Sequence, residues 1–363
     1  MPRIDARIVL APVLTGALLL TAWTAPRWSA PPAADPGPAD TGLVVRAEPQ
    51  LIEPGPNAEA AGAAGYWVDV EVPDASAGQA VRLEVWAEGR WVVEDEGPTD
   101  DKGEVRLVSP EAAYSRIVTL IDGARSVTEL NPTLAGPALW LSEEFDDGLV
   151  SELWLKVDQP DEGPTCSTSD QDQVVEADGV MTLTVEEDPD RMCRTTGLPA
   201  RLNGHLIYRG QLGYGTTAAR IRFPRNRDVT GQFWLQPGDP GLPWLIDDNH
   251  EGVLIGGTAG TEAHPRFDTD VHTSVDGVIR SSRRVVPTDL GVNDGQFHVY
   301  AVRWMPDGYT FLIDGNEVRT VKAATILPPM TVGLAMLAPR RALPTDAADR
   351  AMDVDWFRVW APS

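Results

Sequence analysis

The sequence predicts an all-β protein in which a small antiparallel β-sandwich precedes a larger two-sheet β domain. Short runs that alternate polar and apolar residues recur at about ten-residue spacing, as they do in antiparallel sandwiches. No long segment has the apolar periodicity of a helix. The chain has 363 residues, 42% of them hydrophobic, which is enough for two domains with separate cores.

The N-terminal segment 1–25 has the pattern of a signal peptide or an N-terminal anchor. Residues 1–7 are basic, and residues 8–22 form an apolar stretch. This stretch is shorter than the roughly 20 residues that span a bilayer, so we expect a secreted, extracellular protein without a transmembrane domain. An uncleaved anchor is the alternative. Residues 26–42 are rich in Pro, Ala and Asp and are expected to form a solvated linker.

Residues 43–133 are expected to form the small sandwich. Its alternating runs are 66–72, 81–86, 104–108 and 115–120. The spacing of these runs resembles immunoglobulin-like modules of secreted proteins, and we expect a spacer or accessory domain. Trp67, Trp86 and Trp91 are expected to pack in or against the core, and a sugar-stacking face is the alternative.

The charge of the chain excludes one class of function. The sequence has 54 acidic and 30 basic residues, and its formal net charge is -24 at pH 7. A body this acidic is repelled by phosphate backbones and by anionic membrane surfaces. We therefore expect no nucleic-acid partner.

Residues 136–363 are expected to form two large packed sheets, because strand and turn signals follow one another along the whole segment. The informative segments are LSEEFDDG at 141–148 followed by Trp154, RLNGHLIY at 201–208, ARIRFP at 219–224, QFWLQP at 232–237, VHT at 271–273, QFHVYAVRW at 296–304 and MDVDWFRV at 352–359. In this order and spacing they resemble glycoside hydrolase family 16, the laminarinase and lichenase group. The resemblance implies a concanavalin A-like β-jelly roll.

The resemblance also implies a catalytic strand with the pattern E-x-D-x-E, or E-x-D-x-x-E where a bulge adds one residue. Alternation puts the three carboxylates on one face of the strand, and the bulge re-aims the last one. We expect this strand at 251–256. Glu251 then takes the nucleophile position, Val253 the middle position, and Gly256 the acid/base position, or Ile255 without a bulge. One of the three expected carboxylates is present.

A second register puts Ile246 at the nucleophile position, Asp248 in the middle and Glu251 at the acid/base position. We favour the first register, because residues 253–255 have strand character and residues 247–250 have loop character. Neither register supplies both Glu residues, and replacement from elsewhere is a further alternative. The candidates for replacement are His250, Glu262, Asp268 and Asp270.

Three functional hypotheses remain open. The first is a retaining hydrolase of O-glycosyl bonds in an extracellular polysaccharide, with Glu251 as the best single catalytic candidate. The second is a catalytically silent, lectin-like protein that binds the same polysaccharide. The third is a cell-surface structural protein. A β-glucan is the first choice of polysaccharide and a galactan the next, and we expect a monomer that needs no cofactor for catalysis.

Substrate-binding residues are also implied by the resemblance. Trp234 and Trp244 match aromatic residues that line the family's cleft, where an indole packs on the C–H face of a sugar ring. His272 matches a cleft histidine that hydrogen-bonds sugar hydroxyls, and Tyr214 and Arg220 are weaker candidates. The alternative for Trp234 is core packing, and for His272 it is a hydrogen-bonded histidine of the sandwich.

A structural Ca²⁺ site is a further implication of the resemblance. Glu144 in the opening segment and Asp355 in the closing strand match the family's ligand positions, and carboxylate oxygens suit Ca²⁺. The alternative is a pair of surface carboxylates in an acidic protein.

The sequence contains 2 cysteines, Cys166 and Cys193. In an exported protein such a pair indicates one disulfide. Two free buried thiols are the alternative.

Overall fold

The structure of the chain is a computed structural model. It describes residues 43–49, 51, 66–75, 77–87, 89–109, 115–121, 124–130, 139–146, 148, 150–160, 166–225, 228–237, 251–261, 264–275, 278–286, 294–322, 326, 329–339 and 341–361. The predicted export segment 1–25 and linker 26–42 lie outside these residues. Within the described part of the chain, no helix has the length and apolar character needed to span a bilayer.

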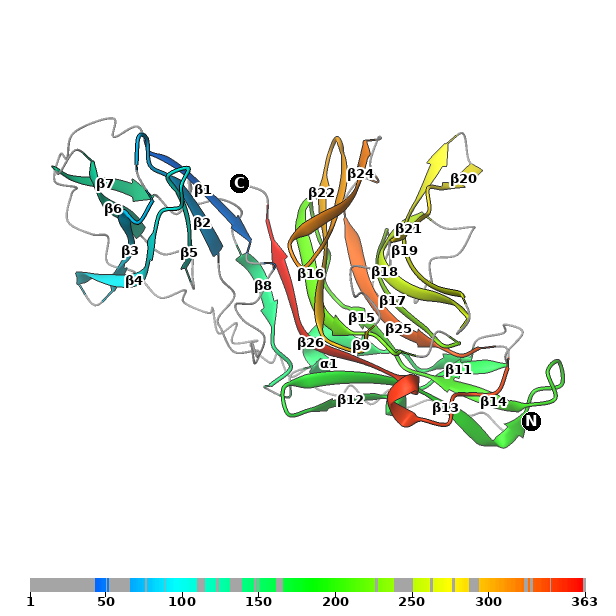
Figure 1. The fold of residues 1–363 in the computed structure, drawn as a ribbon. Coiled ribbons are helices and arrows are strands. Elements are labelled where there is room, and N and C mark those ends of the chain that lie inside the picture. The colour runs from blue at the N-terminus through cyan, green and yellow to red at the C-terminus, as the bar shows by residue number, and fades with distance from the viewer. Residues whose placement is uncertain are drawn as a thin grey trace, which may run out of the picture.

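The N-terminal module is a sandwich of two antiparallel sheets (Figure 1). The first sheet consists of β1 (Val44–Pro49), β2 (Tyr66–Glu71) and β5 (Glu104–Ser109). The second consists of β3 (Ala80–Ala87), β4 (Arg90–Pro98), β6 (Ser115–Ile121) and β7 (Ala124–Leu130). Every second residue of β3 is buried, and Val81 and Leu83 pack with Val68, Val70 and Ile117 in one core. Its relation to immunoglobulin-like modules stays a prediction.

The three tryptophans of this module are half-buried. The guanidinium of Arg106 lies 4.0 Å from the ring centroid of Trp67. The rings of Trp86 and Trp91 meet edge to face at 5.3 Å. These contacts favour packing over sugar stacking, because a guanidinium or a neighbouring indole already covers part of each ring.

The larger domain consists of an eleven-stranded and an eight-stranded sheet, which confirms the all-β prediction (Figure 1). The eleven-stranded sheet contains β8 (Leu139–Glu143), β10 (Gln159–Pro160), β11 (Ser167–Ser169), β12 (Val174–Ala177), β13 (Val180–Met192), β14 (Pro199–Asn203), β16 (Gly215–Arg222), β22 (His298–Met305), β23 (Gly308–Ile313), β24 (Asn316–Lys322) and β26 (Ala351–Trp360). The eight-stranded sheet contains β9 (Trp154–Lys156), β15 (His205–Tyr208), β17 (Thr230–Pro237), β18 (Gly252–Thr261), β19 (His264–Val275), β20 (Val278–Ser281), β21 (Arg284–Val286) and β25 (Met330–Leu337). Short helical turns are α1 (Val150–Leu153), η1 (Gln171–Gln173) and η3 (Ala347–Arg350).

The core between the two large sheets is rich in aromatic residues. The ring of Trp154 packs edge to face on Phe357 at 5.2 Å, and Phe223 does so on Tyr300 at 5.0 Å. Strand β13 shows how the sequence produces this core. Met181, Leu183 and Val185 are buried and the residues between them are not, because successive side chains of a strand point to opposite faces. Each large sheet therefore has an inner face in this core and an outer face turned away from it.

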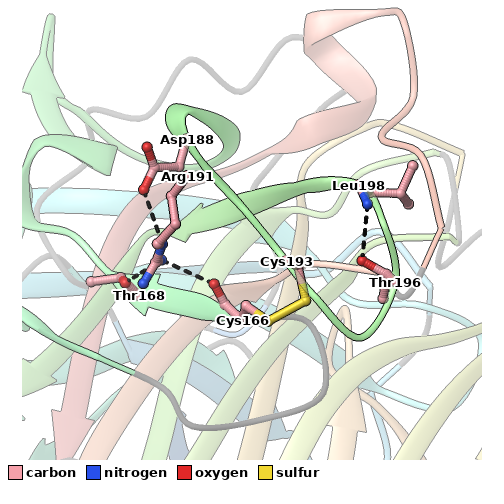
Figure 2. The surroundings of a disulfide bond; sticks show 7 residues. All are labelled: Cys166, Thr168, Asp188, Arg191, Cys193, Thr196 and Leu198. Carbon is pink, nitrogen blue, oxygen red and sulfur yellow. Dashed lines mark hydrogen bonds and ion pairs between the residues drawn. A yellow bond between two sulfur atoms is a disulfide. The ribbon is translucent and has the colours of Figure 1, made fainter.

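The predicted disulfide between Cys166 and Cys193 is present (Figure 2). It joins the segment before β11 to the turn between β13 and β14. The side chain of Arg191 reinforces the same junction, donating to the backbone oxygen of Cys166 at 2.9 Å and to Oγ1 of Thr168 at 2.7 Å. The disulfide therefore holds one rim of the larger domain.

Replacing both cysteines by serine is expected to lower the free energy of unfolding. The disulfide spans 27 positions, and the chain-entropy model gives about 3–4 kcal/mol for a loop of this size. Urea unfolding of the double variant and the parent measures the difference. Equal unfolding midpoints with equal slopes would contradict the expectation.

Candidate functional site

Strand β18 is the strand on which the sequence places the catalytic residues. Val253 and Ile255 pack in the core between the two large sheets, whereas Leu254 packs with Trp234 on the outer face of the eight-stranded sheet. Alternation then puts Gly252 on the outer face as well.

A β-bulge changes the phase of the strand after Ile255. Phe233 of β17 pairs with Gly256, while the next residue, Trp234, pairs with Leu254. A Cβ added to Gly256 would lie 2.6 Å from Cζ of Phe267 in the core, so Gly256 faces inward like Ile255. A Cβ on Gly257 would lie 3.3 Å from Cδ1 of Leu254, so Gly257 faces outward. Two consecutive inward residues are what a bulge produces.

The outward positions of the bulged strand are therefore Gly252, Leu254 and Gly257. Their spacing is that of E-x-D-x-x-E, the bulged pattern of the family resemblance. None of the three residues carries a carboxylate. Within the described residues, β18 thus has the backbone geometry of the pattern without its chemistry.

This register corrects the one expected from the sequence by one residue, and a one-residue slip exchanges the two faces of a strand. Val253, Ile255 and Gly256 face the core. By alternation, Glu251 lies on the same face as Val253. Burial raises the pKa of the nearby Tyr309 to about 12, and the negative charge of Glu251 contributes to this rise. A catalytic role for Glu251 stays a prediction. Ile246, Asp248, His250 and Glu262 lie outside the described residues.

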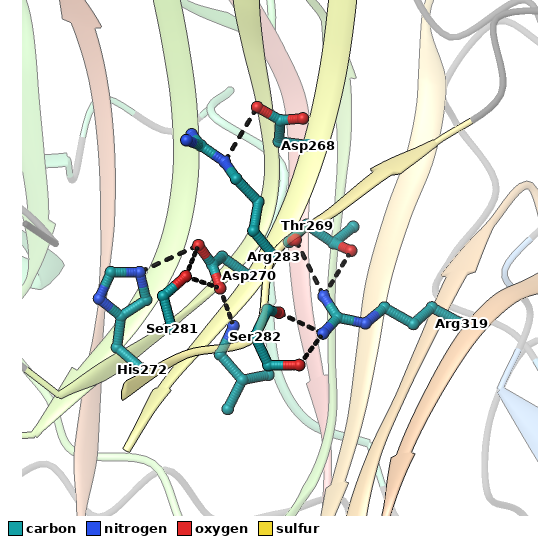
Figure 3. Close-up of polar contacts among 9 residues, drawn as sticks. Asp268, Thr269, Asp270, His272, Ser281, Ser282, Arg283 and Arg319 are labelled. Atoms are coloured by element: carbon teal, nitrogen blue, oxygen red, sulfur yellow. Dashed lines mark hydrogen bonds and ion pairs between the residues drawn. The ribbon is translucent and has the colours of Figure 1, made fainter. Parts of the chain in front are cut away.

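Polar side chains instead line the adjacent strand β19 (Figure 3). Asp268 pairs with Gly257, Asp270 with Leu254, and His272 with Gly252. Phe267 and Val271 of the same strand pack in the core, so these three polar residues face outward beside β18. Directly paired residues have Cβ atoms about 4.5–5.5 Å apart. Each position that lacks a carboxylate therefore has a polar neighbour across the ladder.

The carboxylate of Asp270 is a hydrogen-bond acceptor for several groups at once. Oγ of Ser281 donates to it at 2.8 and 2.9 Å, the backbone N–H of Val271 at 2.8 Å, and Nε2 of His272 lies 3.1 Å away. Burial alone raises the pKa of Asp270, but the hydrogen bonds from His272 and Ser281 outweigh it and lower the pKa below its ordinary value. Asp270 is consequently ionised at neutral pH.

Asp268 forms an ion pair with one arginine, and a second arginine hydrogen-bonds the neighbouring residues Thr269 and Ser282. Nε of Arg283 lies 3.1 Å from Oδ2 of Asp268, whose side chain is buried. Arg319 of β24 reaches across from the other sheet, and its Nη1 donates to Thr269 while its Nη2 donates to Ser282 (Figure 3). Ser281 and Arg283 were not predicted from the sequence, although the alternation of Asp268, Asp270 and His272 along the strand indicates a polar face.

Trp234 lies on the expected face but is fully buried. Its Nε1 donates to Oε1 of Gln236 at 2.8 Å, and its ring centroid is 5.5 Å from that of His205. Gly333 lies directly under the indole, since a Cβ there would be 2.2 Å from Cζ2. This packing gives a sugar no open ring face, in keeping with the packing alternative for Trp234. Trp244 lies outside the described residues.

The two weaker binding candidates lie elsewhere. Tyr214 packs against the core with its ring edge-on to Trp304 at 4.8 Å. Arg220 lies on the outer face of the eleven-stranded sheet, where its Nη1 pairs with Asp355 at 2.7 Å. Alternation in β16 explains this, because the flanking Ala219 and Ile221 point into the core. Neither residue joins the polar row of β19.

The two residues predicted to hold calcium are paired with arginines, and the calcium site stays a prediction. Both carboxylate oxygens of Glu144 accept from Arg358 at 3.0 Å, and Asp355 is paired with Arg220. A calcium ion takes six to eight oxygen ligands, so binding it would require these carboxylates to exchange their arginine partners for the ion. Among the described residues, no group of three or more His, Cys, Asp or Glu side chains is placed to hold a metal.

Comparison with protein families agrees with the motifs of the larger domain. The profile of the family described as "Glycosyl hydrolases family 16" matches residues 161–358. Gram-negative bacteria-binding protein 3 of Drosophila melanogaster is 30% identical over 109 residues, which cover 29% of this chain and 22% of that protein. The match thus spans about a fifth of that relative's length.

The solved structures that match the chain include two proteins at low sequence identity. The laminarinase catalytic domain of Thermotoga maritima has 14% identity and a TM-score of 0.49, covering 62% of this chain and 99% of its own. Porphyranase B of Zobellia galactanivorans has 18% identity and a TM-score of 0.49, covering 61% and 90%.

The bulge predicts that two adjacent glycines respond differently to alanine. Gly256→Ala pushes a methyl group into the buried ring of Phe267 and is expected to cost about 1–3 kcal/mol. Gly257→Ala meets only contacts of 3.3 Å or more and is expected to cost less than about 1 kcal/mol. Thermal and urea unfolding of both variants measure the order, and a larger loss for Gly257→Ala would overturn the register.

Buried His205 predicts a loss of stability in acid. Burial lowers the pKa of its imidazole from 6.5 to about 4. The unfolded chain therefore binds a proton that the folded chain does not between these values. Stability contributed by neutral His205 is present above pH 6.5 and is lost as the pH falls towards 4, by about 3 kcal/mol. Urea unfolding at several pH values should show His205→Gln with a flatter pH dependence than the parent, and an equal slope in both would contradict this.

Proposed function

Since the chain belongs to glycosyl hydrolase family 16, we propose that it binds a polysaccharide without hydrolysing it. The proposal places the protein outside the cell, in keeping with the export-like N-terminal sequence. A β-glucan is the first candidate ligand and a galactan the second. The name of the Drosophila relative describes a protein that binds bacteria, which is in keeping with a binding role.

The observation that carries the proposal is the composition of β18. A retaining glycosidase needs two carboxyl groups about 5–5.5 Å apart, one as nucleophile and one as acid/base. The three positions of β18 with the required spacing and direction hold Gly252, Leu254 and Gly257. Glycine and leucine can neither attack an anomeric carbon nor transfer a proton.

The carboxylates of β19 are poor substitutes. A general acid must hold a proton near neutral pH, but the hydrogen bonds from His272 and Ser281 keep Asp270 ionised. Asp268 is buried and paired with Arg283. Both groups therefore act as acceptors that order the surface beside β18.

Exposed polar groups at this edge support a binding role. Arg283 has 51% of its side chain exposed, and Ser281 is also exposed. Asp268 and Asp270 hold these two side chains at the outer face of β19. Hydroxyl and guanidinium groups are donors suited to sugar hydroxyls.

The test pairs binding with catalysis on laminarin, lichenan and agarose. We expect no reducing-sugar release, and retardation of the native protein in an affinity gel that contains at least one of these glycans. Glu251→Gln and Asp270→Asn are assayed beside the parent, each with a circular dichroism spectrum to confirm folding. Neither variant should change the release of sugar.

Other results of these assays would support the alternative functions. Release that Glu251→Gln abolishes would make Glu251 catalytic and end the proposal of a silent site. Release that only Asp270→Asn abolishes would locate a hydrolase on β19. Neither release nor retardation on any of the three glycans would contradict glycan binding and favour the structural hypothesis.

A further inference from the structure

An apolar area lies on the outer face of the eleven-stranded sheet, on the opposite side of the domain from β18. Alternation places it there, because the neighbours of its residues in β16 and β22 point into the core. Its members, all at most 8% exposed, are Ala218, Val299, Ala301, Leu312, Trp356 and Trp360. We call these six residues the back patch. The outer face of an antiparallel sheet is normally polar, so burial of this patch requires a cover.

Leu51 of the N-terminal module is part of that cover. It belongs to the same buried cluster as the back patch and is 4% exposed. It lies two residues after Pro49, the last residue of β1, and is therefore close to the first sheet of the N-terminal module. In Figure 1 this module lies on the side of β8 and β26, away from β17 to β21.

The back patch places two small side chains beside two large ones. Ala218 of β16 pairs directly with Ala301 of β22, so two methyl groups form a shallow floor in the middle of the patch. Two indoles of β26 provide bulk beside that floor. One of them, Trp356, is held by the guanidinium of Arg358 at 4.2 Å from its ring centroid, and Arg358 is in turn held by Glu144.

We infer that Leu51 docks the N-terminal sandwich onto the back patch, so that the two modules move as one body. The module is then a fixed part of the larger domain rather than a mobile spacer. The back patch, despite its two tryptophans, is an internal docking surface and not a second platform for sugar stacking. The outer face of β18 and β19 stays on the opposite side of the domain.

A distance measurement on the full chain tests this inference. Val93→Cys in the N-terminal module and Val285→Cys in the larger domain replace exposed residues, 48% and 47% exposed, and the native cysteines are already paired. Spin labels at these two sites report the distribution of distances between the modules. We expect a narrow distribution, which Leu51→Asp broadens by about twofold or more, because modules without an apolar contact move independently.

Leu120→Asp is the matched control. Leu120 belongs to the same module but is 55% exposed, so its substitution should leave the distribution narrow, and Leu51→Met should do the same. A broad distribution in the parent would overturn the inference, and so would a Leu51→Asp distribution as narrow as that of the parent. If Leu51→Asp fails to fold, the parent and Leu51→Ala decide the question. No glycan is involved, so the outcome is independent of the proposed function.

Discussion

The β-bulge at Ile255 and Gly256 decides which side chains of β18 reach the outer face of the eight-stranded sheet. Gly256 points at the rings of Phe267 and Tyr300, where no side chain would fit. The strand therefore resumes its alternation one residue later, and Gly257 turns outward beside Leu254. The position at which the family pattern has an acid/base carboxylate therefore faces outward, but in this chain the residue there is Gly257.

The polar chemistry of this face lies one strand away. Asp268, Asp270 and His272 of β19 face outward across the ladder from the positions that lack carboxylates. Asp268 is ion-paired with Arg283. Hydrogen bonds from His272 and Ser281 lower the pKa of Asp270 and keep it charged. A surface ordered in this way is suited to presenting hydrogen-bonding groups, whereas double displacement needs one free nucleophile and one protonated acid.

The class of fold and the disulfide were predictable from the sequence, because alternation, turn residues and cysteine count are local properties. The register of β18 was not, since it depends on how Gly256 packs against Phe267 of β19 and Tyr300 of β22 in the other sheet. Burial of Trp234 likewise depends on Gly333 beneath its ring. The carboxylates predicted to bind calcium, such as Glu144, are paired with arginines that become neighbours only when β26 pairs with β8 and with β16. The sequence pattern was enough to locate β18, whereas the side chains that face outward from it are determined by tertiary contacts.

Covalent trapping tests the absence of a catalytic nucleophile most directly. A 2-deoxy-2-fluoro glycoside with an activated leaving group, built on the glycan that the protein binds, accumulates as a glycosyl ester on the nucleophile of a retaining enzyme. Intact-protein mass spectrometry after prolonged incubation should show the unmodified mass. A stoichiometric adduct, mapped by peptide sequencing to Glu251, Asp268 or Asp270, would contradict a silent site.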